Sequence, residues 1–321
     1  MSLASIASWM LHWLSLSRDR EERVAEQHAP VTGKPQMIDT TARVESNLEI
    51  VSGYRLLTLS FAQDIRVRAG QFAMLKDRFS HEPLLRRALA IYRAQGPKHL
   101  TFLYQVLGRG TEALSQLESG GRVDALVPLG NGWLDFPEVQ PEGGKRRHRA
   151  IVVAGGIGSA SVLMLCNELS QRGSETHIFF GAATERVAEG CGLDDLRELA
   201  LPLTLTTDDG SLGESGFVTA PLERYVREGG GEGATIYACG PWVMMRRVAE
   251  IAARYSVRCL ASLEAPMGCG FGVCVGCVVA VKHEGPAGYG SYRRVCIDGS
   301  VFPAETIRWE VNAMAHRGAA Q

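Results

Sequence analysis

The order of apolar and polar residues divides the chain into a region of short strands and a later region where strands and helices alternate. Across residues 37–142, strand-like runs such as 50–61 and 100–106 are rich in β-branched and aromatic residues and are separated by turns. One helix fits this region, with Thr111 as its N-cap and an end at Gly120. Several short strands within one region predict a small antiparallel β-barrel over 37–142.

A different pattern begins at residue 146, after a polar, basic stretch. A buried strand at 150–154 leads through a glycine turn into an amphipathic helix. Strands that alternate with helices predict a parallel sheet, so we expect an α/β domain over residues 146–257. The further strands expected are 177–181, 203–207 and 235–239, and the further helices are 193–200, 220–228 and one that ends at Arg254.

The glycine turn of this second region lies between a strand and a helix, an arrangement typical of a dinucleotide-binding site. Gly155, Gly156 and Gly158 stand between a strand and a helix, although their spacing is G-G-x-G and not G-x-G-x-x-G. Ligands of parallel sheets bind at the carboxyl ends of the strands. The other expected strand ends carry Gly181, Asp208 and the run Cys239, Gly240 and Pro241.

Four cysteines in a glycine-rich stretch give the most specific chemical signal. They are Cys269, Cys274, Cys277 and Cys296, in the spacing C-x4-C-x2-C followed by a fourth cysteine. This is the plant-type spacing for a [2Fe–2S] cluster. Two irons and two bridging sulfides need four converging thiolates, so the loop backbone must come close to the cluster. The glycines that permit this approach are Gly268, Gly270, Gly272 and Gly276.

The alternatives for these cysteines are a zinc site and disulfide bonds. A structural zinc site usually has two C-x2-C pairs, and this stretch has one. Disulfides fit poorly with a chain that lacks a clear secretory signal. The remaining cysteines are scattered and are expected to be small buried side chains: Cys166, Cys191, Cys239 and Cys259.

Length and charge limit the classes of function. A chain of 321 residues suggests two or three domains, and a formal net charge of -1 argues against a nucleic-acid partner. The apolar run 3–16 is too short to span a bilayer. For residues 1–36 we expect either an interfacial helix with membrane contact, a helix that docks on a partner, or a frayed extension. We expect the cytoplasm as the location, and a short tail at residues 313–321.

Two features of the first region could bind an anion. Arg86 and Arg87 enter a strand, where a guanidinium can hold a pyrophosphate with two hydrogen bonds. Gly108, Gly110 and Thr111 open the expected helix, whose free N–H groups attract anions. Taken alone, an arginine pair is more often a solvated surface feature and such a turn is more often a cap.

Several motifs together resemble one known family. They are the segments 262–277 and 295–302, P-L-G-N-G at 128–132, G-R-G-T at 108–111 and T-D-D-G-S-L-G at 207–213. Over residues 37–312 the chain resembles the electron-transfer subunits of NAD-dependent, type B dihydroorotate dehydrogenases, within the ferredoxin–NADP reductase superfamily. The resemblance implies an FAD-binding barrel, an NAD-binding α/β domain and a small [2Fe–2S] domain at 258–312.

The resemblance also implies roles for single residues. FAD binding falls on Arg87, Ala88, Leu89, Ala90, Leu103, Tyr104, Gln105, Gly110 and Thr111. NAD binding falls on Gly155, Gly156, Gly158, Asp208, Cys239, Gly240 and Pro241. The chain departs from the family at Ala90, where Ser or Thr is usual, and at Ala88 and Ser161, where Pro is usual. Hydride transfer from a flavin needs no general acid or base, so no catalytic residue is expected.

The resemblance implies a partner and a direction of electron flow. An FMN-containing dihydroorotate dehydrogenase subunit, in a heterotetramer with two copies of each chain, passes electrons through the [2Fe–2S] cluster and FAD to NAD. NAD is favoured over NADP because no cluster of Arg and Lys follows the second α/β strand to neutralise a 2′-phosphate, although the nearby Arg186 leaves NADP open. Alternatives are a reductase subunit of a hydrogenase or glutamate synthase, an oxygenase reductase, and a redox-sensing protein without enzymatic activity.

Overall fold

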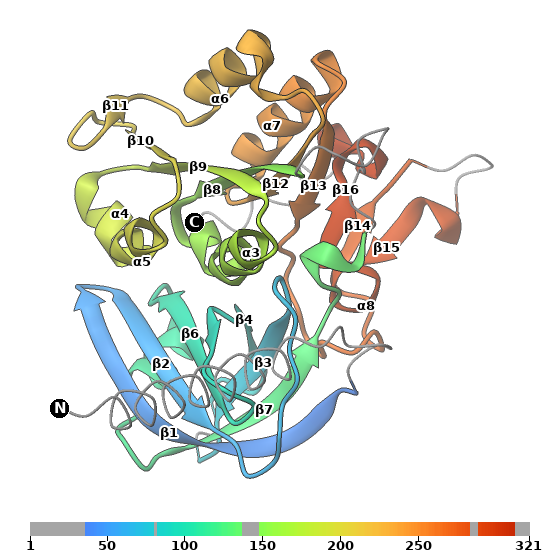
Figure 1. Ribbon diagram of the computed structural model, residues 1–321. Helices are drawn as coiled ribbons and strands as arrows, with labels where there is room; N and C mark the ends of the chain where they lie inside the picture. The colour runs from blue at the N-terminus through green and yellow to red at the C-terminus, as the bar shows by residue number, and fades with distance from the viewer. Residues whose placement is uncertain (1–35, 80–81, 137–147, 283–287, 312–321) are drawn as a thin grey trace, which may run out of the picture. The chain divides into compact units, whose positions relative to one another are not determined.

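The computed structural model describes residues 36–79, 82–136, 148–282 and 288–311 (Figure 1). The chain divides into two units, Met1–Pro35 and Gln36–Gln321, and every described residue belongs to the second. The expected extension at the N-terminus, the polar stretch before residue 148 and the C-terminal tail lie outside the described residues. Among the described helices, none is both long and apolar enough to cross a bilayer.

The first part is an antiparallel sheet that curls into an open barrel. Its strands are β1 (Ile38–Val51), β2 (Tyr54–Ser60), β3 (Phe72–Asp77), β4 (Arg87–Ala90), β5 (Arg93–Ala94), β6 (His99–Gln105) and β7 (Arg122–Leu129). They pair in the order β4-β3-β7-β1-β2-β6-β5. Alternate side chains such as Val44, Leu57 and Phe102 fill the interior and are fully buried. The expectation of an antiparallel barrel is confirmed, with β4 and β5 at the two edges.

The helix of the barrel, α2 (Arg109–Ser115), begins earlier than the sequence predicts. Gly108 is its N-cap, so the prediction of Thr111 as N-cap is wrong. The Thr111 hydroxyl instead reaches back and accepts hydrogen bonds from the N–H groups of Leu107 (2.9 Å) and Gly108 (3.2 Å). A threonine oxygen can satisfy free N–H groups of a first turn from either position, and the pattern alone does not separate the two.

The second part is a parallel sheet covered by helices on both faces (Figure 1). Its strands are β8 (Arg149–Gly155), β9 (Glu175–Ala182), β10 (Leu203–Thr207), β11 (Glu214–Ser215), β12 (Ala234–Cys239), β13 (Arg258–Ser262) and the antiparallel β16 (Val301–Pro303), in the order β11-β10-β9-β8-β12-β13-β16. The helices are α3 (Ser159–Gln171), α4 (Glu185–Gly190), α5 (Leu193–Glu198), α6 (Thr219–Tyr225) and α7 (Trp242–Arg254).

Two hydrophobic cores lie on opposite faces of this sheet. Ile151 and Val153 of β8 belong to the core that α6 and α7 cover, whereas Val152 and Ala154 belong to the core that α3, α4 and α5 cover. Successive side chains of a strand point to opposite faces, so a strand buried on both sides reads as one apolar run. The expected α/β fold is therefore confirmed.

The C-terminal part is small and built on the edge of the same sheet. It contains β14 (Val278–Ala280), β15 (Tyr292–Arg294) and α8 (Val295–Asp298), and β14 pairs with β15 in an antiparallel sheet of two strands. The strands β13 and β16, within the expected 258–312 domain, extend the parallel sheet. The cysteine loop therefore leaves a rigid strand, β13, and the chain returns to that strand through β16.

The segment after β7 contacts both other parts. The Asn131 side chain donates to Val301 O and accepts from Val301 N, each at 2.9 Å. The Trp133 indole N–H donates to Ser161 O of α3 at 2.9 Å, and its backbone N–H donates to Ala69 O of the barrel. Asn131 belongs to the P-L-G-N-G motif, so the end of that motif connects the barrel with β16 through hydrogen bonds.

Candidate functional site

The loop between β13 and β14 presents backbone N–H groups to its own sulfur atoms. The Cys274 N–H donates to Cys269 Sγ, and the Gly276 N–H donates to Cys274 Sγ, both at 3.4 Å. Burial raises the pKa of the Cys269 thiol, but amide hydrogen bonds from Cys274, Phe271 and Val273 outweigh it and lower the pKa to about 6. Such amides stabilise thiolates and tune the potential of iron–sulfur clusters.

The four cysteines expected to hold metal form two pairs. Cys269 and Cys274 are hydrogen-bonded neighbours, and Cys277 Sγ lies 3.2 Å from Cys296 Sγ on α8. In a [2Fe–2S] cluster each iron takes two thiolates beside the two shared sulfides, so two pairs are the arrangement it needs. Among the described residues, no three His, Cys, Asp or Glu side chains are close enough to hold one metal ion. A structural zinc ion takes four ligands around one centre, whereas these four thiols are divided into two pairs.

The two pairs differ in exposure. Cys277 and Cys296 are buried, whereas Cys274 is exposed on the loop. Burial, together with the adjacent Cys277, raises the pKa of the Cys296 thiol to about 12. One side of the site therefore faces solvent, and the other side lies in the core of the C-terminal part.

Arg87 and Gly110, predicted from separate motifs, lie in direct contact. A Cβ atom on Gly110 would be 1.9 Å from Arg87 Nε, so only glycine leaves room for the guanidinium there. Arg87 Nη1 also donates to Leu85 O at 3.1 Å. The cationic group and the backbone of α2 meet in a cradle that suits a pyrophosphate. Thr111 lies beside this cradle and holds the turn with its hydroxyl.

The strand β4, which begins at Arg87, has two faces. Leu89 packs against the barrel interior, whereas Ala90 packs against the core that α3 covers. Ala88 is exposed. Ala88 and Ala90 therefore present small side chains outside the barrel, and no hydroxyl is available at Ala90 to bond a ligand.

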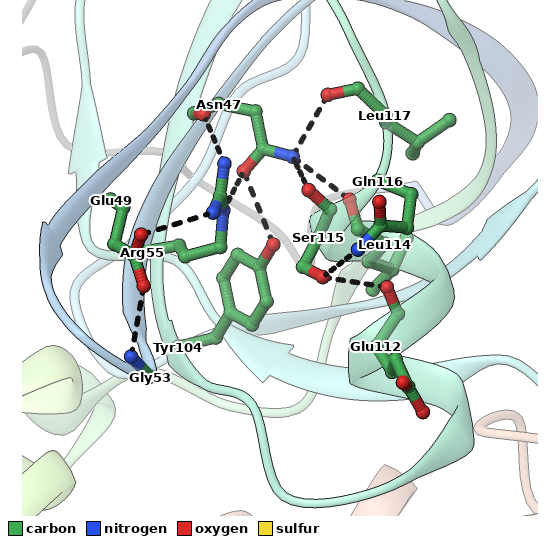
Figure 2. A network of polar contacts seen from close by, with 10 residues as sticks. All are labelled: Asn47, Glu49, Gly53, Arg55, Tyr104, Glu112, Leu114, Ser115, Gln116 and Leu117. Carbon is green, nitrogen blue, oxygen red and sulfur yellow. Dashed lines mark hydrogen bonds and ion pairs between the residues drawn. The ribbon is translucent and has the colours of Figure 1, made fainter.

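The residues at the end of β6 that were expected to bind FAD lie on both sides of the sheet. Leu103 packs outside the barrel, where a Cβ on Gly192 would be 3.3 Å from its Cδ2. Tyr104 points inward, and its hydroxyl donates to Asn47 Oδ1 at 3.1 Å (Figure 2). Burial raises the pKa of Tyr104 to about 12, which keeps it a neutral donor. Gln105 ends the strand and is half-buried.

Asn47 connects this tyrosine with the helix of the cradle, and the sequence did not single it out. Its side-chain amide donates to the carbonyls of Leu114 (2.9 Å), Leu117 (3.0 Å) and Ser115 (3.4 Å) at the C-terminal end of α2 (Figure 2). A helix leaves its last carbonyl groups without partners, and Asn47 satisfies them. The one feature of the sequence that could have indicated Asn47 is its amide side chain in a strand where apolar and polar residues otherwise alternate.

The predicted nucleotide residues of β8 and β12 come together at the carboxyl edge of the parallel sheet. Ala154 of β8 lies opposite Cys239 of β12. A Cβ on Gly158 would be 2.4 Å from Cys239 O, and one on Gly155 would be 2.8 Å from Pro241 Cδ. The two turns touch, and glycine is required for that contact.

The rest of the predicted nucleotide set shares this edge of the sheet. Gly240 packs against Gly155, since a Cβ on Gly240 would be 2.9 Å from Gly155 Cα. Gly156 has φ +52° and open space around it. Asp208 follows β10, two strands away from β8, and its N–H donates to Ala182 O at 3.0 Å.

The cysteine loop lies on the barrel, beside the strand that carries Arg87. A Cβ on Gly270 would be 2.5 Å from Met74 Cγ and 3.2 Å from Leu129 Cδ1, so the loop contacts β3 and β7. Met74 lies directly opposite Ala88 of β4. Directly paired residues share one face of a sheet. The loop and the exposed face of β4 are therefore neighbours.

Comparisons with known proteins agree with this arrangement. Residues 264–308 match the family profile described as the iron–sulfur cluster binding domain of dihydroorotate dehydrogenase B. The chain is 35% identical over 243 residues to the dihydroorotate dehydrogenase B (NAD(+)) electron transfer subunit of Desulforamulus reducens, which covers 75% of this chain and 87% of that protein. The subunit of the same name from Bacillus caldolyticus is 37% identical over 260 residues, 78% of this chain and 91% of that protein.

The chain belongs to this family of electron transfer subunits. The family expected from the sequence is thereby confirmed, and with it an oxidoreductase subunit. The alternatives of a hydrogenase or glutamate synthase subunit are not favoured. The relatives that match most of this chain are subunits of dihydroorotate dehydrogenase B.

Solved structures show the same fold. An NADH-dependent reduced ferredoxin–NADP oxidoreductase matches with a TM-score of 0.69 at 22% identity, over 91% of this chain and 100% of that chain. A ferredoxin–NADP+ reductase from Neisseria gonorrhoeae, solved with FAD and NADP, matches with a TM-score of 0.55 at 18% identity, over 68% of this chain and 93% of that chain. This chain therefore shares its fold with both structures, over 91% and 68% of its length.

Proposed function

We propose that this chain passes electrons from the catalytic subunit of a dihydroorotate dehydrogenase to NAD. In this proposal the four cysteines hold a [2Fe–2S] cluster, the barrel binds FAD at β4 and α2, and the carboxyl edge of the parallel sheet binds NAD. The observation that carries it is the contact of the cysteine loop with Met74, whose neighbour Ala88 lies on the proposed flavin strand. One-electron and two-electron carriers must be close to exchange electrons, and this packing supports that closeness.

The bound groups would supply the redox chemistry, with a flavin able to connect one-electron and two-electron carriers. The residues of this chain bind and orient. Arg87 neutralises the charge of a pyrophosphate, and the Gly110 backbone lets the guanidinium approach it. Gly155 and Gly158 let the turns after β8 and β12 pack closely, so that a dinucleotide can lie across them. Cys239 is fully buried at this edge, where burial raises the pKa of its thiol to about 12 and keeps it neutral.

The partner subunit is proposed to bind where the cluster site is exposed. Phe271, Val273 and Val275 lie within three residues of the exposed Cys274 and are themselves exposed, with Val273 at 72%. Apolar side chains around a redox site favour a protein partner over bulk water. A heterotetramer with two copies of each chain and a cytoplasmic location complete the proposal, and for residues 1–36 the three expectations of an interfacial helix, a docking helix and a frayed extension stay predictions.

A coupled assay tests this function. The purified chain, loaded with FAD and cluster, is mixed with the FMN-containing dihydroorotate dehydrogenase subunit of the same organism, and NADH formation from dihydroorotate and NAD is followed. We expect NADH only when both subunits are present. Reduction of artificial dyes by NADH without any coupling to dihydroorotate would contradict the proposed partner and direct the search to other electron-transfer partners.

A further inference from the structure

Met74 is the barrel side chain that meets the cysteine loop most closely. It is fully buried, and a Cβ on Gly270 would lie 2.5 Å from its Cγ and 3.3 Å from its Sδ. Gly270 follows Cys269 directly and has φ +82°, a conformation that favours glycine. The loop backbone next to a cluster ligand therefore rests on the Met74 side chain without a side chain of its own between them.

Sheet geometry places Met74 beside the proposed flavin strand. Met74 lies opposite Ala88, and Phe72 lies opposite Ala90. Cβ atoms of directly opposed residues are about 4.5–5.5 Å apart on one face of the sheet. Because Ala88 is short, Met74 is the longer side chain of its pair, and it reaches the loop together with Leu129 of β7. It also packs in one core with the ligands Cys277 and Cys296.

We propose that Met74 is a positioning residue that sets the separation between the cluster loop and the flavin-binding face of the barrel. This inference rests on the proposed function. The thioether is flexible and polarisable, which suits a side chain that must fill the space against a bare glycine backbone. Removal of the side chain leaves Gly270 without its support, so the loop shifts relative to β4 while both cofactor sites keep their ligands.

The test compares Met74→Ala with Leu59→Ala. Leu59 is equally buried but lies inside the barrel, away from the loop, so it controls for lost packing alone. Each holoprotein is mixed anaerobically with NADH, which supplies two electrons to the flavin side, and transfer of one of them to the cluster is timed by absorbance. FAD content, iron content and the electron paramagnetic resonance spectrum of the reduced cluster are measured alongside.

We expect cluster reduction in Met74→Ala to slow several-fold, because the rate of electron transfer between two carriers falls as their separation grows. The spectrum of its cluster should change, whereas Leu59→Ala should match the wild type in both readouts. Equal rates and spectra for the two variants, at equal cofactor content, would overturn the role of Met74. Failure of NADH to reduce the wild-type cluster would instead overturn the proposed function, and this inference with it.

A loss of cluster from Met74→Ala is resolved by Met74→Val, which shortens the side chain but leaves more of it in place than alanine does. We then expect a full iron content with a changed spectrum and slower transfer. Wild-type rate and spectrum in that variant would contradict the inference.

Discussion

At the scale of single residues, the barrel brings the guanidinium of Arg87 against the backbone of α2. Arg87 and Gly110 are 23 positions apart in the sequence. Arg87 lies over Gly110 so closely that a methyl group on the glycine would overlap its Nε. The same glycine-dependent contact occurs between Gly158 and Cys239 O in the parallel sheet. In both places the glycine has no side chain, so a second group can come close to its backbone. That group is the Arg87 guanidinium at Gly110 and the Cys239 carbonyl at Gly158.

Gly110→Ala should weaken FAD binding while leaving the barrel folded. The new methyl group displaces the flexible Arg87 side chain, and alanine is well tolerated within a helix. A hydrogen bond to a charged group contributes about 1.5–3 kcal/mol, so the FAD dissociation constant should rise by roughly tenfold or more. Equilibrium binding of FAD to the apoprotein measures this.

Gly108→Ala is the matched control for this change. Gly108 has extended backbone angles, and a Cβ there meets no atom within 4 Å. Its FAD affinity should equal that of the wild type. If the two alanine variants bind FAD alike, the cradle of Arg87 and Gly110 is not where the pyrophosphate binds.

At the scale of elements, α2 is short and is held at its C-terminal end by one side chain. Asn47 donates to the carbonyl groups of Leu114 and Ser115 in α2 and of Leu117 just after it, and it accepts from Tyr104 (Figure 2). Arg55 Nη2 in turn donates to Asn47 O at 2.8 Å. An isolated helix of seven residues is unstable in water. The position of Gly110 at the other end of α2 therefore depends on Asn47.

Asn47→Asp keeps the shape and the acceptor for Tyr104 but replaces the donor with a carboxylate oxygen. That oxygen would face the carbonyls of α2, so the free energy of unfolding should fall by about 1–3 kcal/mol. FAD binding should weaken as well, because α2 is no longer fixed. Denaturant unfolding and FAD titration measure the two effects.

Glu49→Gln provides the comparison in the same network. Its carboxylate is 52% exposed and lies 4.0 Å from Arg55 Nη1, so the change should stay within about 0.5 kcal/mol. An Asn47→Asp variant as stable as Glu49→Gln would mean that α2 is held by apolar packing and not by the amide.

At the scale of the whole molecule, the segment after β7 connects the described parts. Trp133 is fully buried, its indole donates to Ser161 O, and its ring meets Tyr237 edge-on at 5.9 Å between centroids. Asn131 makes two hydrogen bonds to Val301 of β16. Any transfer between groups held by different parts depends on this segment for their relative position.

Trp133→Phe should lower the free energy of unfolding by about 1–3 kcal/mol, because Ser161 O loses its buried donor. It should also slow reduction of bound FAD by NADH, since the contact links the barrel to α3. Calorimetry and anaerobic rapid mixing measure these effects. The same replacement at the half-buried Trp242, whose indole bonds Trp309 O at 3.3 Å, should change neither as much. Equal effects at both positions would argue against a joining role for Trp133.

Elements buried on both faces were the ones that the sequence predicted best. The strands expected at 150–154 and 235–239 lie within one residue of the observed bounds of β8 and β12, which are buried along almost their whole length. Helix ends were less well predicted. α5 ends at Glu198, before a left-handed Ala200, and α6 ends at Tyr225, where the chain passes into a wider turn with Gly229 at φ +96°. Helix ends depend on local angles and contacts that periodicity does not record.

The sequence by itself determined the chemistry that is local in the chain. The spacing of Cys269, Cys274 and Cys277 and the turn that ends at Gly158 are short motifs, in which backbone geometry limits what the residues can do. The tertiary structure decided how these motifs meet. It paired Cys277 with Cys296, placed Asn47 at the C-terminal end of α2 and brought Met74 of β3 into contact with the cysteine loop. Those contacts depend on strand register and packing between distant segments, which no local pattern specifies.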